Sequence, residues 1–413
     1  MRRNALSALL IISLIICNIT SCRSQASQPP FSLTCSPYLQ NLLENGITIM
    51  WMVNNNASSW VEYGKTEQRG SKAIHTQAGM IDVNPGVQKI VLTGLEPGTR
   101  YFYRVASREV KLHQAYKVIY GDTIFSQTYS FTTPSSNTQQ FSFLAFNDLH
   151  SKPQFISDIM KRETRFSFVL LNGDILGDIK TEEEIAKYLL IPFSNYFATS
   201  KPFFFTRGNH ETRGSGARSL SKYIDTPTGM YYYSFTYGNT CFIVLDCGED
   251  KPDDNPEYFG LADYDNYRME EAEWLSLEVQ KPAFKNAEYK IVCIHMPITL
   301  HPPEENIAGH GFIDCSKKFA PILNEAGIDL LLAGHTHQFK VIHPQKGVTS
   351  FPIIIGGAPV SGKDTEKTTY TLVEVDKSGI NCFLKKVNGD IIEEVKIAKQ
   401  NSRNKKQLLQ RVK

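Results

Sequence analysis

The sequence predicts a two-domain protein in which an all-β sandwich precedes a larger α/β layered domain. Residues 32–133 consist of short strands broken by turns, and every second residue of 47–53 is large and apolar. After residue 141, buried apolar strands alternate with helices, which is the pattern of an α/β layer structure. The chain has 413 residues, 41% of them apolar and 21% charged, which excludes collagen-like, wholly disordered and polytopic membrane proteins.

The N-terminus has the features of an export signal. Two arginines precede the apolar stretch 5–16, which is too short to cross a bilayer as a helix. The stretch leads to ITSC, which resembles a bacterial lipoprotein box and implies lipidation of Cys22; an ordinary signal peptide cleaved nearby is the alternative. We therefore expect a signal peptide at 1–21, a tether at 22–31, membrane attachment through Cys22, and a location in the bacterial periplasm or outer membrane.

The charge distribution argues against nucleic-acid binding. Of the formal charge of +2, Arg2 and Arg3 contribute two and the stretch 396–413 contributes seven, which leaves −7 for residues 4–395. So acidic a body is a poor partner for nucleic-acid phosphates. The basic tail at 399–413 is expected to be a frayed terminus rather than a membrane or nucleic-acid arm.

The cysteines after Cys22 show neither a tight disulfide spacing nor a zinc-finger spacing, so the sequence does not define their pairing. Cys241 and Cys247 lie six residues apart on what looks like one extended strand, too far to bridge each other. With Cys293, which lies in an apolar run, they are expected to be core residues.

The first domain contains strings that resemble a fibronectin type III signature and, in particular, the N-terminal domain of purple acid phosphatases. These strings are LTGLEPGTRY at 92–101, FTTP at 131–134, PYLQ at 37–40 and VEYG at 61–64. We assign 32–134 to this all-β immunoglobulin/fibronectin-like sandwich and the entirely polar stretch 135–140 to a linker.

The second domain is expected to span 141–398. Its predicted elements are strands at 141–146, 166–171, 202–205, 290–294 and 330–333, helices at 154–162, 182–196 and 269–279, a hairpin of 231–237 with 241–245, and closing strands at 370–375 and 381–387.

Polar side chains directly follow five of these strands. Ligand sites in open α/β sheets lie beyond the carboxyl ends of the strands, so groups almost 190 residues apart can converge. Residues two apart on an extended segment point the same way, which lets Asp-x-His and His-x-His each present two donors. Taken alone, each of these motifs is more often part of a turn or a helix cap than part of a functional site. If all of them were structural, however, polar residues of these types would have to follow five strands by chance. The set comprises Asp148, His150, Asp174, Asn209, His210, His295, His335 and His337.

In order along the chain, these residues resemble the five motifs of the calcineurin-like metallophosphoesterases: DLH, GD, GNHE, a single His, and GHTH. The resemblance implies a metallophosphoesterase α/β sandwich and two metal ions that share Asp174 as a bridge. It implies a first ion bound by Asp148, His150, Asp174 and His337. It implies a second ion bound by Asp174, Asn209, His295 and His335.

Imidazole, carboxylate and carboxamide donors without thiolates suit two divalent ions such as Mn, Fe or Zn and do not select among them. Two such ions lower the pKa of a shared water and leave a centre of about +1 for a phosphoryl anion. We expect an exported phosphohydrolase that cleaves phosphate esters by in-line attack of a metal-bridging hydroxide, most simply a phosphomonoesterase. The alternatives are a phosphodiesterase or nucleotide hydrolase with the same site and, more remotely, a non-catalytic binding protein.

Two positions depart from the purple acid phosphatases. Those enzymes have Gly where His150 stands and a metal-binding Tyr where this chain has Gly177, so an iron(III)-tyrosinate colour is not expected. Related enzymes often have Asp at that second position. Here Asp178 comes one residue later, which leaves a role beside the site and a surface role equally open.

His210 adjoins the expected ligand Asn209 without being assigned to a metal. We expect it to hydrogen-bond the phosphoryl oxygens or to protonate the leaving oxygen. Glu211 is a candidate to orient His210, with a surface carboxylate as the alternative. Candidates for substrate contact, each with an ordinary exposed role as the alternative, are Arg207, Arg213, His301 and His310.

Overall fold

The computed structural model describes residues 29–304, 309–357 and 368–399. The predicted signal peptide at 1–21, the lipidation site Cys22, most of the predicted tether and nearly all of the basic tail lie outside these ranges. Across the described ranges, no helix combines the length and the apolar character that crossing a bilayer would need.

The N-terminal domain is an antiparallel β-structure organised around the 19-residue strand β2 (Gly46–Gly64). The first half of β2 pairs with β1 (Leu33–Leu43) and β6 (Asn84–Thr93). Its second half pairs with β3 (Ser71–Ile74) and β7 (Arg100–Gln114). The apolar residues predicted at every second position of 47–53 are buried, and so are Thr48 and Met50 between them, so both faces of this part of β2 are covered. The antiparallel strands agree with the predicted all-β sandwich. The remaining strands are β4 (Thr76–Gln77), β5 (Met80–Ile81), β8 (Lys117–Phe125) and β9 (Tyr129–Thr132).

The second domain contains two six-stranded sheets. The first has the order β12-β11-β10-β19-β20-β21, in which β10, β11 and β12 are parallel. Its strands are β10 (Phe141–Phe146), β11 (Phe168–Asn172), β12 (Phe203–Thr206), β19 (Thr369–Val375), β20 (Gly379–Lys386) and β21 (Ile391–Ala398).

The second sheet has the order β13-β14-β15-β16-β18-β17, in which β14, β15, β16 and β18 are parallel. Its strands are β13 (Tyr233–Tyr237), β14 (Thr240–Val244), β15 (Tyr289–Cys293), β16 (Leu330–Ala333), β17 (Lys340–Ile342) and β18 (Ile353–Ile355). β13 and β14 form the predicted hairpin.

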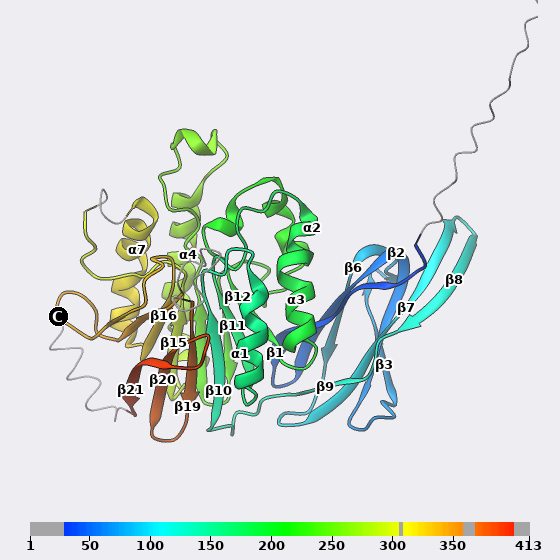
Figure 1. Cartoon of the computed structure of the whole chain (residues 1–413), viewed down its shortest axis with the longest axis horizontal. Coiled ribbons are helices and arrows are strands. Elements are labelled where there is room, and N and C mark those ends of the chain that lie inside the picture. The colour runs from blue at the N-terminus through cyan, green and yellow to red at the C-terminus, as the bar shows by residue number, and fades with distance from the viewer. Residues whose placement is uncertain (1–28, 305–308, 358–367, 400–413) are drawn as a thin grey trace, which may run out of the picture. The chain divides into compact units, whose positions relative to one another are not determined.

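The sheets pack face to face, with helices on their outer faces (Figure 1). Alternate residues of β10 enter different cores: Phe143 and Ala145 lie between the sheets, whereas Leu144 and Phe146 lie against the helices. The helices over the first sheet are η1 (Pro153–Phe155), α1 (Ile156–Arg162), α2 (Glu182–Ile185), η2 (Ala186–Leu190), α3 (Ile191–Phe193) and η3 (Ser194–Ala198). Those near the second sheet are α4 (Tyr264–Glu278), α5 (Pro282–Lys285) and α7 (His310–Ala326). Short 3-10 turns are η4 (His210–Thr212), η5 (Ser215–Lys222) and η6 (Pro256–Tyr258). The α/β layers therefore confirm the predicted fold class.

Two helices differ from prediction for local reasons. The helix predicted at 269–279 begins earlier, at Tyr264, because the carboxylate of Asp253 accepts hydrogen bonds from the N–H groups of Tyr264 and Asp265 at 2.8 and 2.9 Å. The helix predicted at 182–196 contains two π-helical turns on either side of Pro192, which has no N–H to donate.

The described cysteines are all free and buried, among them Cys241, Cys247 and Cys293. Only Cys241 lies on β14, so the expectation of one strand carrying both Cys241 and Cys247 was wrong. The proposed domain boundaries near 134 and 141 stay a prediction.

Candidate metal centre

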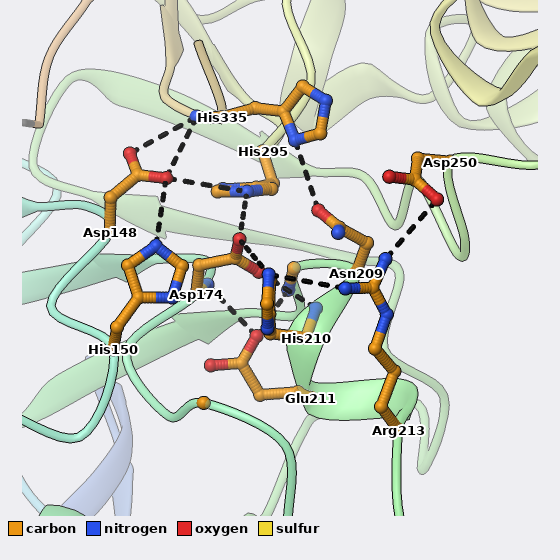
Figure 2. Close-up of polar contacts among 12 residues, drawn as sticks. Asp148, His150, Asp174, Asn209, His210, Glu211, Arg213, Asp250, His295 and His335 are labelled. Atoms are coloured by element: carbon orange, nitrogen blue, oxygen red, sulfur yellow. Dashed lines mark hydrogen bonds and ion pairs between the residues drawn. The ribbon is translucent and has the colours of Figure 1, made fainter. Parts of the chain in front are cut away.

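The predicted metal ligands converge at the carboxyl ends of parallel strands from both sheets. Figure 2 shows all of them except His337. Asp148 and His150 follow β10, Asp174 follows β11 and Asn209 follows β12. His295 follows β15, and His335 and His337 follow β16. The structure thus brings together all seven residues that the sequence proposed as ligands.

The donor atoms form two groups that share one carboxylate. One group contains Asp148, His150, Asp174 and His337, with one donor atom from each within 4.8 Å of the others. The other contains Asp174, His295 and His335 within the same limit. Asn209 extends the second group, because its Oδ1 lies 3.0 Å from Nδ1 of His335. This grouping matches the two sets that the family resemblance implied.

The backbone conformation at these residues differs from the one assumed in the sequence analysis. Asp148, His150, Asp174, His335 and His337 all have left-handed backbones, with φ between 46° and 70°. The Asp-x-His and His-x-His pairs therefore converge through tight left-handed turns and not through an extended segment. Such conformations are costly for residues other than glycine and concentrate at functional sites.

Two glycines permit the close approach of these side chains. A Cβ on Gly173, which has φ +85°, would lie 2.3 Å from Nδ1 of His295. A Cβ on Gly208 would lie 2.2 Å from Oδ1 of Asp174. The glycines of the GD and GNH motifs therefore provide space for two of the candidate ligands.

The donor set fits a metal ion. Nε2 of His150 and Nε2 of His337 lie 3.0 Å apart, so both ring nitrogens face one small space. Nε2 of the fully buried His295 lies 3.1 Å from Oδ2 of Asp174, an ion pair without the geometry of a hydrogen bond. Nδ1 of His295 lies 3.0 Å from the carbonyl oxygen of Asn172, which directs Nε2 toward the centre as in many histidine metal ligands.

The charges of the centre favour a cation among these donors. Burial alone would lower the pKa of His295, but the carboxylates of Asp174 and Asp148 raise it to about 10. Burial opposes ionisation of Asp174, and the neighbouring His295 nevertheless holds its carboxyl pKa below the usual range. Burial and His295 together lower the pKa of His335 to about 4, so that its imidazole is neutral and able to coordinate.

His210 lies at the edge of the centre, and Asp178 contacts it. Nε2 of His210 is 3.9 Å from Oδ2 of Asp174, and its Nδ1 is 3.1 Å from Oδ1 of Asp178. Nη1 of Arg213 is 3.2 Å from Nε2 of the same ring. The sequence left the role of Asp178 open; the structure places this carboxylate against His210.

Glu211 does not orient His210, and it is not a surface residue, so both sequence expectations were wrong. Its side chain is buried, and its carboxylate accepts hydrogen bonds from the N–H groups of Asp174, Leu176 and Gly208. Burial and the nearby Asp174 raise its pKa to about 7. Glu211 therefore fixes the loops that carry the ligands, a role for which the sequence holds no signal.

The other candidate substrate contacts occupy different surroundings. The guanidinium of Arg207 lies 2.6 Å from Asp246 and 4.4 Å from the centroid of the Tyr231 ring. His310 lies with Asp265 and Asp314 in a separate group, in which Arg268 contacts both carboxylates. Nδ1 of His301 contacts the carbonyl oxygen of Gly347. Among the four, Arg213 is the one that contacts His210; substrate contacts for all of them stay predictions.

Comparison with known families agrees with the layered fold and with the two groups of donor atoms that share Asp174. Residues 141–339 match the calcineurin-like phosphoesterase family, and residues 36–133 match the purple acid phosphatase N-terminal domain. The chain therefore carries a calcineurin-like phosphoesterase domain behind a purple acid phosphatase N-terminal domain, and it is homologous to purple acid phosphatases. Both assignments support a phosphoester hydrolase.

Similar proteins include plant enzymes of this type. Purple acid phosphatase 18 of Arabidopsis thaliana is 21% identical over 315 residues, which cover 71% of this chain. The match spans 62% of the length of that relative. The purple acid phosphatase PPD1 of yellow lupin, Lupinus luteus, is similar in structure, with a TM-score of 0.66, 15% identity and coverage of 89% of this chain and 75% of that one. The structure of PhoD is similar with a TM-score of 0.58, 12% identity and coverage of 91% of this chain and 96% of that one. The two structural likenesses support the fold.

Proposed function

We propose that the protein is an exported two-metal phosphohydrolase that acts on phosphate monoesters. The observation that carries the proposal is the position of Asp174, whose carboxylate belongs to both groups of donor atoms. Asp148, His150, Asp174 and His337 would hold one ion, and Asp174, Asn209, His295 and His335 would hold the other, as in two-metal phosphoesterase centres. When bound, the ions lower the pKa of a coordinated water and offset the charge of the phosphoryl oxygens.

The chain supplies an acid and an anion contact beside these donors. Asp178 accepts a hydrogen bond from Nδ1 of His210 and so directs Nε2 toward the ester. Without substrate, Nη1 of Arg213 donates to Nε2 of His210. In our proposal, the guanidinium turns to the phosphoryl oxygen when the ester binds, and Nε2, then protonated, gives its proton to the oxygen of the departing alcohol. Arg213, held by its contacts with Glu249, presents Nη1 next to that nitrogen and can hydrogen-bond a phosphoryl oxygen.

The proposed bridge is tested by Asp174→Asn, with the exposed Asp158→Asn as a matched control. We expect Asp174→Asn to lower kcat/KM for an aryl phosphate at least about 10³-fold, because it weakens both sites. Metal content should fall from two ions per chain in parallel. Retention of activity and of both ions by this variant would contradict the mechanism.

The proposed acid is tested by the dependence on the leaving group. His210→Ala should lower turnover of alkyl phosphates far more than turnover of nitrophenyl phosphate, because nitrophenolate leaves without a proton. An equal loss for both esters would exclude His210 as the acid. Asp178→Asn should reproduce the same pattern in weaker form.

Comparison of mono- and bis-(nitrophenyl) phosphate decides between a monoesterase and the alternative phosphodiesterase or nucleotide hydrolase. A binding protein would instead show almost no bound metal and no activity after Mn or Zn is added. The export proposal rests on residues 1–22. Mass spectrometry of the N-terminal peptide tests it, because a lipid should be present on Cys22 in the wild type and absent in Cys22→Ser.

A further inference from the structure

A cavity of about 770 Å³ adjoins the candidate metal centre and is not explained by the phosphoryl chemistry. Its walls include the rings of Tyr231, Tyr258 and Tyr264, with Phe259 and Leu261 also lining it. The volume lies in the range of pockets that enclose a whole small molecule, which is about 300–1,000 Å³. The phosphoryl group itself would occupy only the metal centre.

Arg213 connects the cavity to the centre. Its guanidinium lines the cavity, and its Nη1 lies 3.2 Å from Nε2 of His210. Two hydrogen bonds to Glu249, both 2.9 Å long, fix its position. An ester held at His210 would therefore have its leaving oxygen next to the wall that Arg213 shares with the cavity.

The aromatic walls of the cavity are held in place by specific contacts. The hydroxyl of Tyr258 donates a hydrogen bond to Oε2 of Glu249 at 3.0 Å. The ring of Tyr231 packs against the guanidinium of Arg207, which is itself paired with Asp246. Preformed aromatic walls of this kind suit a flat ring.

Two large apolar side chains at the cavity are left in water. Phe259 is 88% exposed and Leu261 is 72% exposed, and they lie two residues apart on one loop. Apolar side chains grouped beside a cavity indicate a surface that a ligand covers. A ring that enters the cavity would contact both residues.

Three of the four cations that line the cavity are paired with carboxylates. Arg207 pairs with Asp246, and Arg213 pairs with Glu249. Lys251 pairs with both Asp250 and Glu257. Arg218 also lines the cavity, is exposed, and makes no ion pair with a carboxylate in the described part of the chain.

We propose that this cavity binds the alcohol half of the substrate, and that this half carries an aromatic ring. The inference rests on the proposed function and specifies its substrate class. It predicts that the enzyme selects esters by the ring on the leaving alcohol as well as by the phosphate.

The test compares two alkyl phosphates whose alcohols are similarly basic, 2-phenylethyl phosphate and propyl phosphate. We expect kcat/KM of the wild-type protein to favour the phenylethyl ester at least about 10-fold, equivalent to about 1.4 kcal/mol. The double variant Phe259→Ser/Leu261→Ser should lose most of this preference. The matched control is Tyr116→Ser/Leu277→Ser, which alters two residues that are likewise highly exposed but do not line the cavity.

A binding measurement separates recognition from chemistry. Calorimetric titration with 2-phenylethylphosphonate and propylphosphonate, which resist hydrolysis, should give the same order of affinity and the same loss in the double variant. Hydrolysis of both esters without a ring preference would overturn this inference and leave the proposed function intact. A ring preference that survives in the double variant would place the ring elsewhere and also overturn the inference. Absence of hydrolysis of any ester would overturn the proposed function, and this inference with it.

Discussion

Replacing Glu211 by alanine should loosen the candidate metal centre without removing any candidate donor atom. The carboxylate accepts hydrogen bonds from the N–H groups of Gly208 at 2.8 Å, Asp174 at 2.9 Å and Leu176 at 2.8 Å. Each buried N–H that loses its acceptor costs about 1–3 kcal/mol. The three together predict a loss of at least about 3 kcal/mol in the free energy of unfolding, from a typical total of about 5–15 kcal/mol.

Glu211→Gln provides a graded comparison. Oε2 of Glu211 accepts from both Gly208 and Asp174, and Oε1 accepts from Leu176. A glutamine can keep the two bonds at one oxygen but turns its NH₂ group toward Leu176, so about 1–3 kcal/mol should be lost. Glu257→Ala, at a side chain that is 69% exposed, should change the stability by less than about 0.5 kcal/mol.

Urea denaturation of chelated protein measures these losses without a contribution from bound metal. Hydrogen exchange of peptides covering 173–177 and 207–212 reports the three amides directly and should accelerate in the order wild type, Glu211→Gln, Glu211→Ala. In metal-loaded protein, kcat/KM should follow the same order because the backbone of Asp174 is anchored by this carboxylate. A stability of Glu211→Ala within about 1 kcal/mol of wild type, together with unchanged exchange, would refute the reasoning.

Three further outcomes are expected. Gly208→Ala places a Cβ 2.2 Å from Oδ1 of Asp174 and should lower metal content, whereas Gly177→Ala, whose nearest atom is 3.7 Å away, should leave it unchanged in the same metal analysis. Asp246→Ala leaves the buried guanidinium of Arg207 without its carboxylate and should destabilise the fold by about 3–5 kcal/mol in urea denaturation, and a loss below about 1 kcal/mol would contradict the ion pair. The six described cysteines, whose thiol pKa values are all raised by burial, should resist a maleimide at neutral pH until the protein is unfolded, as peptide mass spectrometry can show.

The sequence predicted the site correctly where a buried apolar strand is followed directly by residues that can bind a metal. The apolar runs that became β10, β11 and β12 are buried on both faces, so they are continuous in the sequence and their ends are easily seen. Donor residues follow these ends, and position alone therefore predicted which side chains meet. The resemblance to a family added the division into two groups around Asp174.

What the sequence did not predict depends on contacts between distant segments. Glu211 and Asp178 are both carboxylates in loops, and only the fold distinguishes the one that is buried under backbone amides from the one that contacts His210. The early start of α4 depends on Asp253, which is 11 residues before the first N–H that it caps. The left-handed turns at the ligands were missed because periodicity carries no information about single φ angles.

The same contacts that position the candidate ligands also join the two sheets. The N–H of His335, after β16 of the second sheet, donates to the carboxylate of Asp148, after β10 of the first sheet, at 3.1 Å. A second contact of this kind involves His295, which follows β15 of the second sheet. Its Nδ1 lies 3.0 Å from the carbonyl oxygen of Asn172 at the end of β11 of the first sheet. A metal ion held by His295 and Asp174 would add a further link across this junction. Since ions bind the folded arrangement and not the unfolded chain, part of their binding free energy should stabilise the packing of one sheet on the other. Chelation should therefore increase amide exchange in β10 and β16 together, whereas in an isolated surface site only the ligand loops would respond.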